Sequence, residues 1–167
     1  MNNSVRPTDD INNIENVITT HGNMLFKICL VILCKEQDAE DALQDTFIKY
    51  MLKAPTFSDS EHQKAWLIRV ATNTCKDMRR FKLRHPTIDI DELSNYCTSE
   101  EDTDILEMVL RLPEKYKLVI HLHYIEGYDI TNISEILNIS VSAVKKRLQR
   151  GREKLKIEYG KELLLNG

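Results

Sequence analysis

The stretch that decides the fold lies between residues 130 and 149 and reads Ile-Thr-Asn-Ile-Ser-Glu-Ile-Leu-Asn-Ile-Ser-Val-Ser-Ala-Val-Lys-Lys-Arg-Leu-Gln. Apolar residues recur at threes and fours on both sides of its centre, which predicts two short helices that each have one apolar face. Asn138 lies between them and tolerates the left-handed backbone conformation that a tight turn requires. Ser134 is small enough for a close contact between the helices, and Ser140 can cap the second one. The pattern is typical of a helix-turn-helix.

The second of these helices carries an unusual excess of positive charge. From Ser142 to Lys156 there are seven basic residues and a single acidic one, Glu153. Val144 and Leu148 begin an apolar stripe that Gly151 and Leu155 continue, so the basic side chains are expected to point outward. A helix with one packed stripe and a cationic remainder fits the major groove of DNA.

The candidate DNA contacts on this helix are Ser142, Lys145, Lys146, Arg147 and Arg150. Helix phase favours Arg147 for a base edge, and it favours Lys145 and Arg150 for phosphates. A basic helix alone fits an acidic protein surface equally well. The turn and the preceding helix complete a helix-turn-helix, so DNA is the favoured partner.

The charge of the chain is divided unevenly along its 167 residues, although the net value is only −3. Residues 1–84 hold 12 basic and 11 acidic side chains, residues 85–104 hold none and 7, and residues 105–167 hold 11 and 8. Residues 85–104 also lack helical periodicity, so we expect an acidic, flexible linker between two domains. Local basic patches, rather than the total charge, govern binding to DNA.

The first 84 residues also show helical periodicity. Ile14 to Leu33 carry apolar residues at threes and fours, with a possible break at His21-Gly22-Asn23. A second helix is expected over residues 39–52, with Asp38 as its cap and Pro55 beyond its end. A third is expected from about Glu61 to Arg84. The expected buried stripe of the second helix is Leu43, Phe47, Tyr50 and Met51. We expect an all-α chain with no sheet.

Several function classes are disfavoured by composition. The longest apolar run, Met24 to Cys34, is too short to span a bilayer and contains Lys27. The N-terminus lacks the basic start and apolar core of a signal peptide, so we expect a cytoplasmic protein. The four cysteines, which we expect to be free thiols, form no CxxC pair, and the i,i+2 spacing of His121 and His123 disfavours a shared metal. The cysteines are Cys29, Cys34, Cys75 and Cys97.

Three stretches together resemble a known family. Leu112 to Leu155 closely resembles the domain with which bacterial sigma factors read the promoter −35 element. Asp38 to Tyr50 resembles the helix with which they grip RNA polymerase, and Ala65 to Arg80 resembles their −10-reading segment. The matches keep the family's order and cover about residues 18–84 and 105–158. They indicate the extracytoplasmic-function (ECF) subfamily.

The resemblance implies a division of roles. Residues 1–84 correspond to a region 2-like domain, and residues 105–167 to a region 4-like domain. Asp41, Gln44 and Asp45 are implied contacts to polymerase, with Asp45 standing where glutamate is more usual. The implied −10 contacts are Arg69, Asn73, Lys76, Arg79 and Arg80, followed by Lys82. The implied partners are core RNA polymerase, through its β′ clamp and β flap, promoter DNA and an anti-sigma protein. No cofactor, metal or catalytic residue is implied.

Two other function classes remain open from the sequence. A stand-alone repressor or activator uses the same helix-turn-helix, but it needs a sensor or dimerisation domain that residues 14–84 do not resemble. An enzyme is disfavoured because no HExxH motif, glycine-rich phosphate loop or nucleophile elbow is present.

Overall fold

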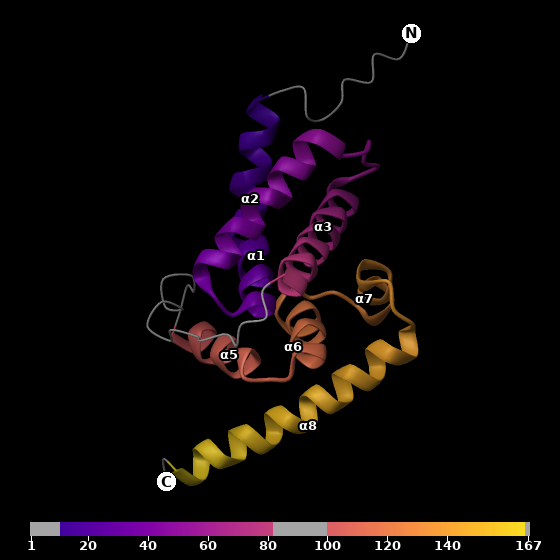
Figure 1. Ribbon diagram of the computed structural model, residues 1–167. Coiled ribbons are helices and arrows are strands. Elements are labelled where there is room, and N and C mark those ends of the chain that lie inside the picture. The colour runs from indigo at the N-terminus through magenta and orange to yellow at the C-terminus, as the bar shows by residue number, and fades with distance from the viewer. Residues whose placement is uncertain (1–10, 82–99, 166–167) are drawn as a thin grey trace. The chain divides into compact units, whose positions relative to one another are not determined.

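The computed structural model describes residues 11–81 and 100–165, and every regular element within these ranges is a helix (Figure 1). The all-α prediction is therefore confirmed. The helices form two compact units, the first built from α1 to α3 and the second from α5 to α8. The flexible linker was predicted over residues 85–104, and residues 85–99 of it lie outside the described residues.

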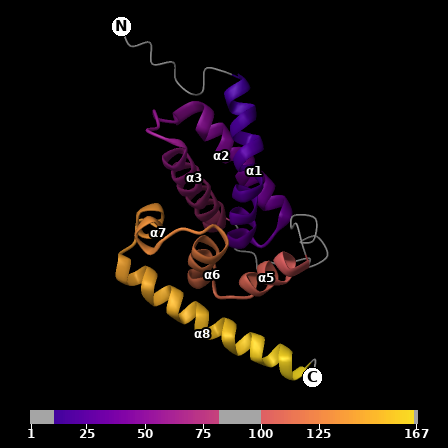
Figure 2. The ribbon, with the colours of Figure 1, turned by 180° about the vertical axis from the view of Figure 1, so that it is seen from behind.

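The first unit consists of α1 (Ile11–Leu33), α2 (Glu36–Lys53) and α3 (Ser60–Phe81), each in contact with the other two (Figure 2). Its core includes Leu25 and Ile28 of α1, Tyr50 of α2 and Leu67 of α3, all fully buried. A side-chain hydrogen bond also joins α2 to α3. Gln63 donates a hydrogen bond to the Tyr50 hydroxyl at 2.9 Å, which satisfies the one polar atom of a buried ring.

Two expectations for α1 and α2 were wrong. α1 runs unbroken through Gly22, because the packing of its buried face outweighs the roughly 1 kcal/mol that glycine costs in a helix. α2 begins at Glu36, with Lys35 at its N-cap and no side-chain cap, so Asp38 lies inside the first turn. An acidic residue there is still favourable, since the N-terminal end of a helix carries partial positive charge.

Cys34 connects α1 to α2 in a left-handed conformation, with φ of 56°. Its backbone N–H donates to the carbonyl of Leu30 at 2.8 Å, which closes the C-terminal end of α1. Glycine accepts a positive φ more readily than other residues do, so the backbone at this junction is strained for a side chain such as that of Cys34.

In the part of the chain that the structure describes, one helix, over Asn13–Leu33, is long and apolar enough to cross a membrane by length and composition alone. Half of that window is buried inside the protein. The core helix of a folded helical bundle has the same composition, so this is weak evidence for a membrane span.

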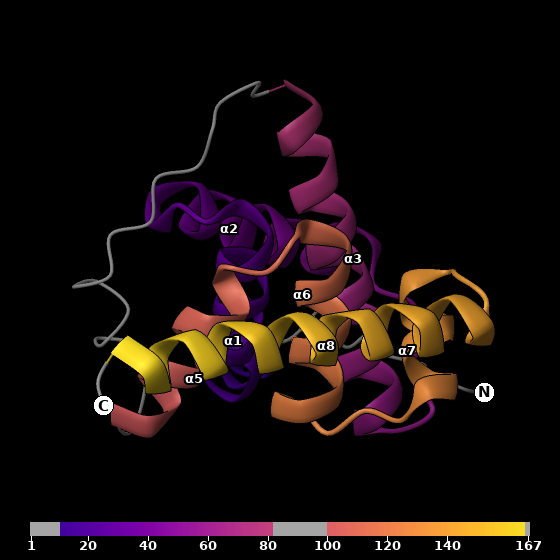
Figure 3. The same cartoon turned by 90° about the horizontal axis from the view of Figure 1, so that it is seen from below.

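The second unit consists of α5 (Glu100–Leu110), α6 (Glu114–Ile120), the π-helical turn η2 (His121–Ile125), α7 (Ile130–Leu137) and α8 (Val141–Leu165). α6 and α7 both pack against α8, the long helix that crosses the view in Figure 3. α5 begins at Glu100, so the last five residues of the expected linker, 100–104, are helical. The acidic stretch at 100–102 was interpreted as linker, although acidic residue types are also favoured at the start of a helix.

The described cysteines fit the expected free thiols. Cys29, Cys34 and Cys75 are buried and form no disulfide, while Cys97 lies outside the described residues. A hydrogen bond with Cys29, together with burial, raises the pKa of the Cys75 thiol. Within residues 11–81 and 100–165, no three His, Cys, Asp or Glu side chains are grouped to hold a metal ion.

Gly151 lets α6 approach α8 closely. A Cβ atom placed on Gly151 would lie 2.7 Å from Cγ1 of Ile120 and 2.9 Å from its Cδ1. Ile120 is itself buried, so it has little room to move away. A side chain at position 151 would therefore push the two helices apart.

We predict that Gly151→Ala lowers the free energy of unfolding of the second unit by about 1–2 kcal/mol, because overpacking outweighs the gain in helix propensity. Gly22→Ala is the matched control. Its Cβ would meet only Ile18, at 4.0 Å, so this variant should be stabilised by up to about 1 kcal/mol. Denaturant unfolding followed by circular dichroism measures both changes, and a Gly151→Ala variant as stable as the parent chain would contradict the prediction.

Candidate nucleic-acid interface

The turn between α7 and α8 has the geometry that the sequence predicts. Asn138 adopts the left-handed conformation, with φ of 53° and ψ of 50°, and its N–H donates to the carbonyl of Ser134. The N–H of Ile139 donates to the same carbonyl at 3.1 Å. These two bonds close the C-terminal end of α7 and redirect the chain into α8 within two residues.

Both helices of the motif are capped at their N-terminal ends. The carboxylate of Asp129 accepts a hydrogen bond from the N–H of Asn132 at 2.7 Å. The hydroxyl of Ser140 accepts from the N–H of Ala143 at 3.1 Å, which confirms its predicted role. Between the helices, Ile133 packs in the same core as Val144 and Leu148, and all three are buried. Side-chain caps and a shared core fix the start of α8, where a reading helix needs to be rigid.

The outward face of α8 is polar and basic. Ser142, Lys145, Lys146 and Arg150 are all exposed, and their spacing places them on one side of the helix. Gln149 is exposed at the centre of the same stripe, although the sequence interpretation did not include it. Its position seven residues after Ser142 is the signal that identifies it, and an amide can read an adenine edge.

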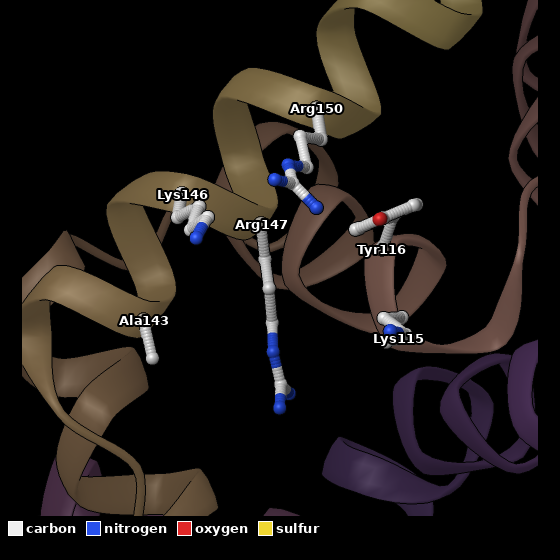
Figure 4. A pocket seen from close by; sticks show the side chains of 6 residues that line it. All are labelled: Lys115, Tyr116, Ala143, Lys146, Arg147 and Arg150. Carbon is white, nitrogen blue, oxygen red and sulfur yellow. The ribbon is translucent and has the colours of Figure 1, made fainter.

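Arg147 occupies a different place from the other candidates. It is half-buried and lines a hollow of about 230 Å³ on the flank of α8, together with Lys115, Tyr116, Ala143, Lys146 and Arg150 (Figure 4). On the α6 side of this hollow, Arg150 hydrogen-bonds the Tyr116 hydroxyl, which lowers the pKa of that phenol. The outermost positions of α8 are thus Ser142, Lys145, Lys146 and Gln149, whereas Arg147 faces α6.

The candidate −10 residues divide in a similar way. Arg69, Asn73, Lys76 and Arg80 are exposed at helical spacing on one side of α3. Arg79 is half-buried beside Cys75, so it lies away from that stripe. Lys82 lies outside the described residues.

The segment before α3 packs onto an aromatic cluster. Phe57 stacks on Tyr50 with ring centroids 6.3 Å apart, and Trp66 meets both rings edge-on at 5.7 and 6.1 Å. Trp66 is therefore tied to the protein interior by two aromatic neighbours. The carboxylate of Asp59 accepts from the N–H of His62 at 2.7 Å and so orders the first turn of α3.

A third face lies on α2, where Asp41, Gln44 and Asp45 are all exposed. Two apolar side chains continue their stripe, Ile48 at 46% exposure and Leu52 at 71%. Met51 was expected to be buried but is 42% exposed at the edge of this stripe, because Thr46, Phe47 and Tyr50 form the packed side of α2.

Lys49 of α2 points inward. Its ammonium group donates to the hydroxyl of Thr74 at 2.9 Å, tying α2 to α3. The exposed α2 face is therefore acidic and apolar, and Lys49 is not part of it.

Comparison with known families matches both units. Residues 17–85 match the model of sigma-70 region 2, and residues 102–155 match that of sigma-70 region 4. The ECF RNA polymerase sigma factor SigW of Bacillus subtilis is 30% identical over 159 residues, covering 84% of this chain and 85% of SigW. The chain belongs to the ECF family of RNA polymerase sigma factors. It is an alternative sigma factor that directs promoter-specific transcription initiation, and it is not an enzyme.

Other proteins are similar to this chain in sequence or in fold. RNA polymerase sigma factor SigZ of Bacillus subtilis is 35% identical over 124 residues, covering 70% of each chain. The solved structure of CnrH in complex with the cytosolic domain of CnrY is 24% identical, with a TM-score of 0.69 over 92% of each chain. The sigma factor RpoE in complex with the anti-sigma factor NepR from Bartonella quintana has a TM-score of 0.70 at 19% identity, covering 87% of this chain and 96% of that one.

The turn at Asn138 gives a direct test of how the reading helix is held. Asn138→Val should lower the free energy of unfolding by about 1–2 kcal/mol, since a β-branched residue is strained at positive φ. Asn138→Gly should leave stability unchanged or slightly higher. Denaturant unfolding distinguishes the two, and equal stabilities for the Val and Gly variants would show that the turn does not require a left-handed residue.

Proposed function

We propose that this ECF sigma factor binds core RNA polymerase through the exposed face of α2 and reads promoter DNA through α8 and α3. The observation that carries the proposal is the pairing of one acidic-apolar face with two cationic faces. Binding to DNA phosphates requires the cationic faces. The acidic-apolar face repels DNA and fits a protein partner instead.

The proposed polymerase contact comprises Asp41, Gln44, Asp45, Ile48 and Leu52 on one side of α2. Exposed apolar side chains ringed by polar ones are typical of protein–protein contacts, where the apolar centre supplies affinity and the polar groups supply specificity. We infer that the β′ clamp of the polymerase covers this face. The β flap is the proposed partner of the second unit.

The proposed −35 reader is α8. Lys145, Lys146 and Gln149 face outward at its centre and are placed to reach base edges in the major groove. Ser142 and Arg150 lie at the borders of that stripe, where the groove walls bring phosphates near. We assign Arg147 to the flank of the helix rather than to a base, because it faces α6.

The proposed −10 reader is α3. Arg69, Lys76 and Arg80 supply positive charge along its exposed side, and Asn73 offers a donor and an acceptor to a base edge between them. Opening of the duplex exposes unstacked bases of one strand, which a polar group beside cations can hold. Arg79 is assigned a supporting role near the core.

An anti-sigma protein is the proposed regulator. Two proteins of the same fold have been solved with a partner: CnrH with the cytosolic domain of CnrY, and the sigma factor RpoE with the anti-sigma factor NepR. The uncovered apolar side chains of α2 offer such a partner a docking surface. We place the protein in the cytoplasm, where its polymerase and its promoters are.

The polymerase face can be tested by binding to core enzyme. Truncation of Ile48 and Leu52 to alanine should weaken binding of the full chain to sigma-free core polymerase roughly tenfold for each residue, because each removes buried apolar area. Asp41→Ala/Gln44→Ala should weaken it further. Fluorescence anisotropy of labelled chain measures the dissociation constants.

Ile18→Ala is the matched control. Ile18 is 43% exposed, like Ile48, but lies on α1 rather than on the α2 face. Its truncation should leave core binding unchanged. If Ile48→Ala and Leu52→Ala bind core as tightly as the parent chain, the polymerase is not docked on this face.

A further inference from the structure

Gln63 joins all three helices of the first unit. Its amide nitrogen donates a hydrogen bond to the buried Tyr50 hydroxyl of α2 at 2.9 Å. His21 of α1, a residue at the predicted break in that helix, hydrogen-bonds the same side chain. This bond acts to raise the pKa of the imidazole, which is the effect of a ring N–H that donates to the amide oxygen. A chain of hydrogen bonds therefore runs from α1 through α3 to α2.

This chain of hydrogen bonds ends at the ring that supports the start of α3. Phe57 stacks on Tyr50 with the ring planes 4° apart, and Trp66 meets Tyr50 edge-on at a centroid distance of 6.1 Å. The ring of His62, in the first turn of α3, stands perpendicular to Phe57 at 5.5 Å. A shift of Tyr50 would therefore move residues 54–59, which lead into α3.

His21 is the group of this junction whose charge changes near neutral pH. Burial lowers its pKa from the ordinary value of 6.5, and the positive charge of Lys64 lowers it further. The hydrogen bond to Gln63 and the carboxylate of Glu61 oppose this shift only in part. Burial raises the pKa of Tyr50, so that phenol stays neutral. Since the unfolded chain binds the proton more readily, the stability from this junction is present above about pH 6.5 and is lost as the pH falls through the pKa of folded His21.

We propose that His21 is a positioning residue for promoter opening, which holds Gln63 and Tyr50 under the start of α3 while it is neutral and releases them when it is protonated. The inference rests on the proposed reading of the −10 element by α3. A charged ring repels Lys64 and loses hydration in this half-buried site, so protonation favours conformations in which His21 withdraws from α3. Unstacked bases need polar groups that are held in fixed positions, so a loosened start of α3 slows opening of the duplex.

The test uses the full chain assembled with core polymerase on a promoter fragment found by transcription-start mapping. A fluorescent base analogue in the −10 element reports opening of the duplex. His21→Gln keeps a polar side chain that does not titrate. The ratio of its opening rate to that of the parent chain should rise about five- to tenfold as the pH falls from about 8 to about 6. The pH dependence of the polymerase itself is common to both rates and cancels in the ratio.

His62→Gln is the matched control, because His62 is exposed and lies at the same end of α3. Its opening rate should keep the acid-dependent fall of the parent chain. Gln63→Met keeps the length of the side chain but breaks both hydrogen bonds. It should slow opening about threefold at about pH 8 and remove the further fall in acid. Binding to core, measured by fluorescence anisotropy, should be equal for His21→Gln and the parent chain at both pH values.

The outcomes separate this inference from the function on which it rests. If the parent holoenzyme opens the −10 element at no pH, the proposed −10 reading fails. If it opens the element but the ratio of the two rates does not change with pH, His21 has no positioning role. Removal of the acid-dependent fall by His62→Gln would also overturn the inference. So would a loss of core binding in acid as large as the loss of opening, because the whole first unit would then be loosened.

Discussion

The close contact between Ile120 and Gly151 is the constraint on which the second unit depends. It lets α6 lie directly on α8, and the same approach places Tyr116 against α8 and Lys115 on its flank. The turn at Asn138 sets the other boundary by fixing α7 against the start of α8. Held at both places, α8 presents its polar stripe as a rigid surface. Rigidity is valuable there, because hydrogen bonds to base edges tolerate little error in position.

The chemistry of the exposed faces separates the partners of the protein. α3 and α8 carry cationic stripes, and α2 carries carboxylates around uncovered apolar side chains. Lys49 increases this contrast, because its ammonium group points inward to donate a hydrogen bond to Thr74 of α3 and adds no positive charge to the exposed face of α2. A sigma factor has to hold polymerase and DNA at the same time. Because α2 is acidic and α3 and α8 are cationic, DNA binds favourably only to α3 and α8, and α2 is left for the polymerase.

Local signals in the sequence were sufficient for much of this structure. The left-handed turn at Asn138 and the cap at Ser140 depend on residues adjacent in the chain, and both predictions are confirmed. The start of α2 was placed three residues late, because Asp38 is a good cap by type but the helix begins without a side-chain cap. Met51 was predicted to be buried because it is apolar and its position in the helical repeat is close to that of the buried stripe of α2, but it is exposed.

Contacts between distant residues were not visible in the sequence. Lys49 meets Thr74 across 25 positions, and no periodicity within α2 indicates that bond. In the same way, helix phase alone placed Arg147 among outward residues, whereas the packing of α6 gives it a neighbour in Lys115. The exposed Ile48 and Leu52 became recognisable as part of a face only once the packed side of α2 was known. Tertiary packing therefore decides which of the residues of suitable type belong to each site.

Transcription from host genomic fragments by sigma-free core polymerase, with and without this chain, tests the central claim most directly. The account predicts run-off transcripts that appear only when the chain is present. Their start sites should share two unlike upstream boxes, as expected for two different reading helices on one chain. Absence of any transcript, together with failure to bind core or to compete with another sigma factor, would contradict the account. Protection of a palindrome by the chain alone would contradict it as well, because a symmetric site indicates a dimeric repressor.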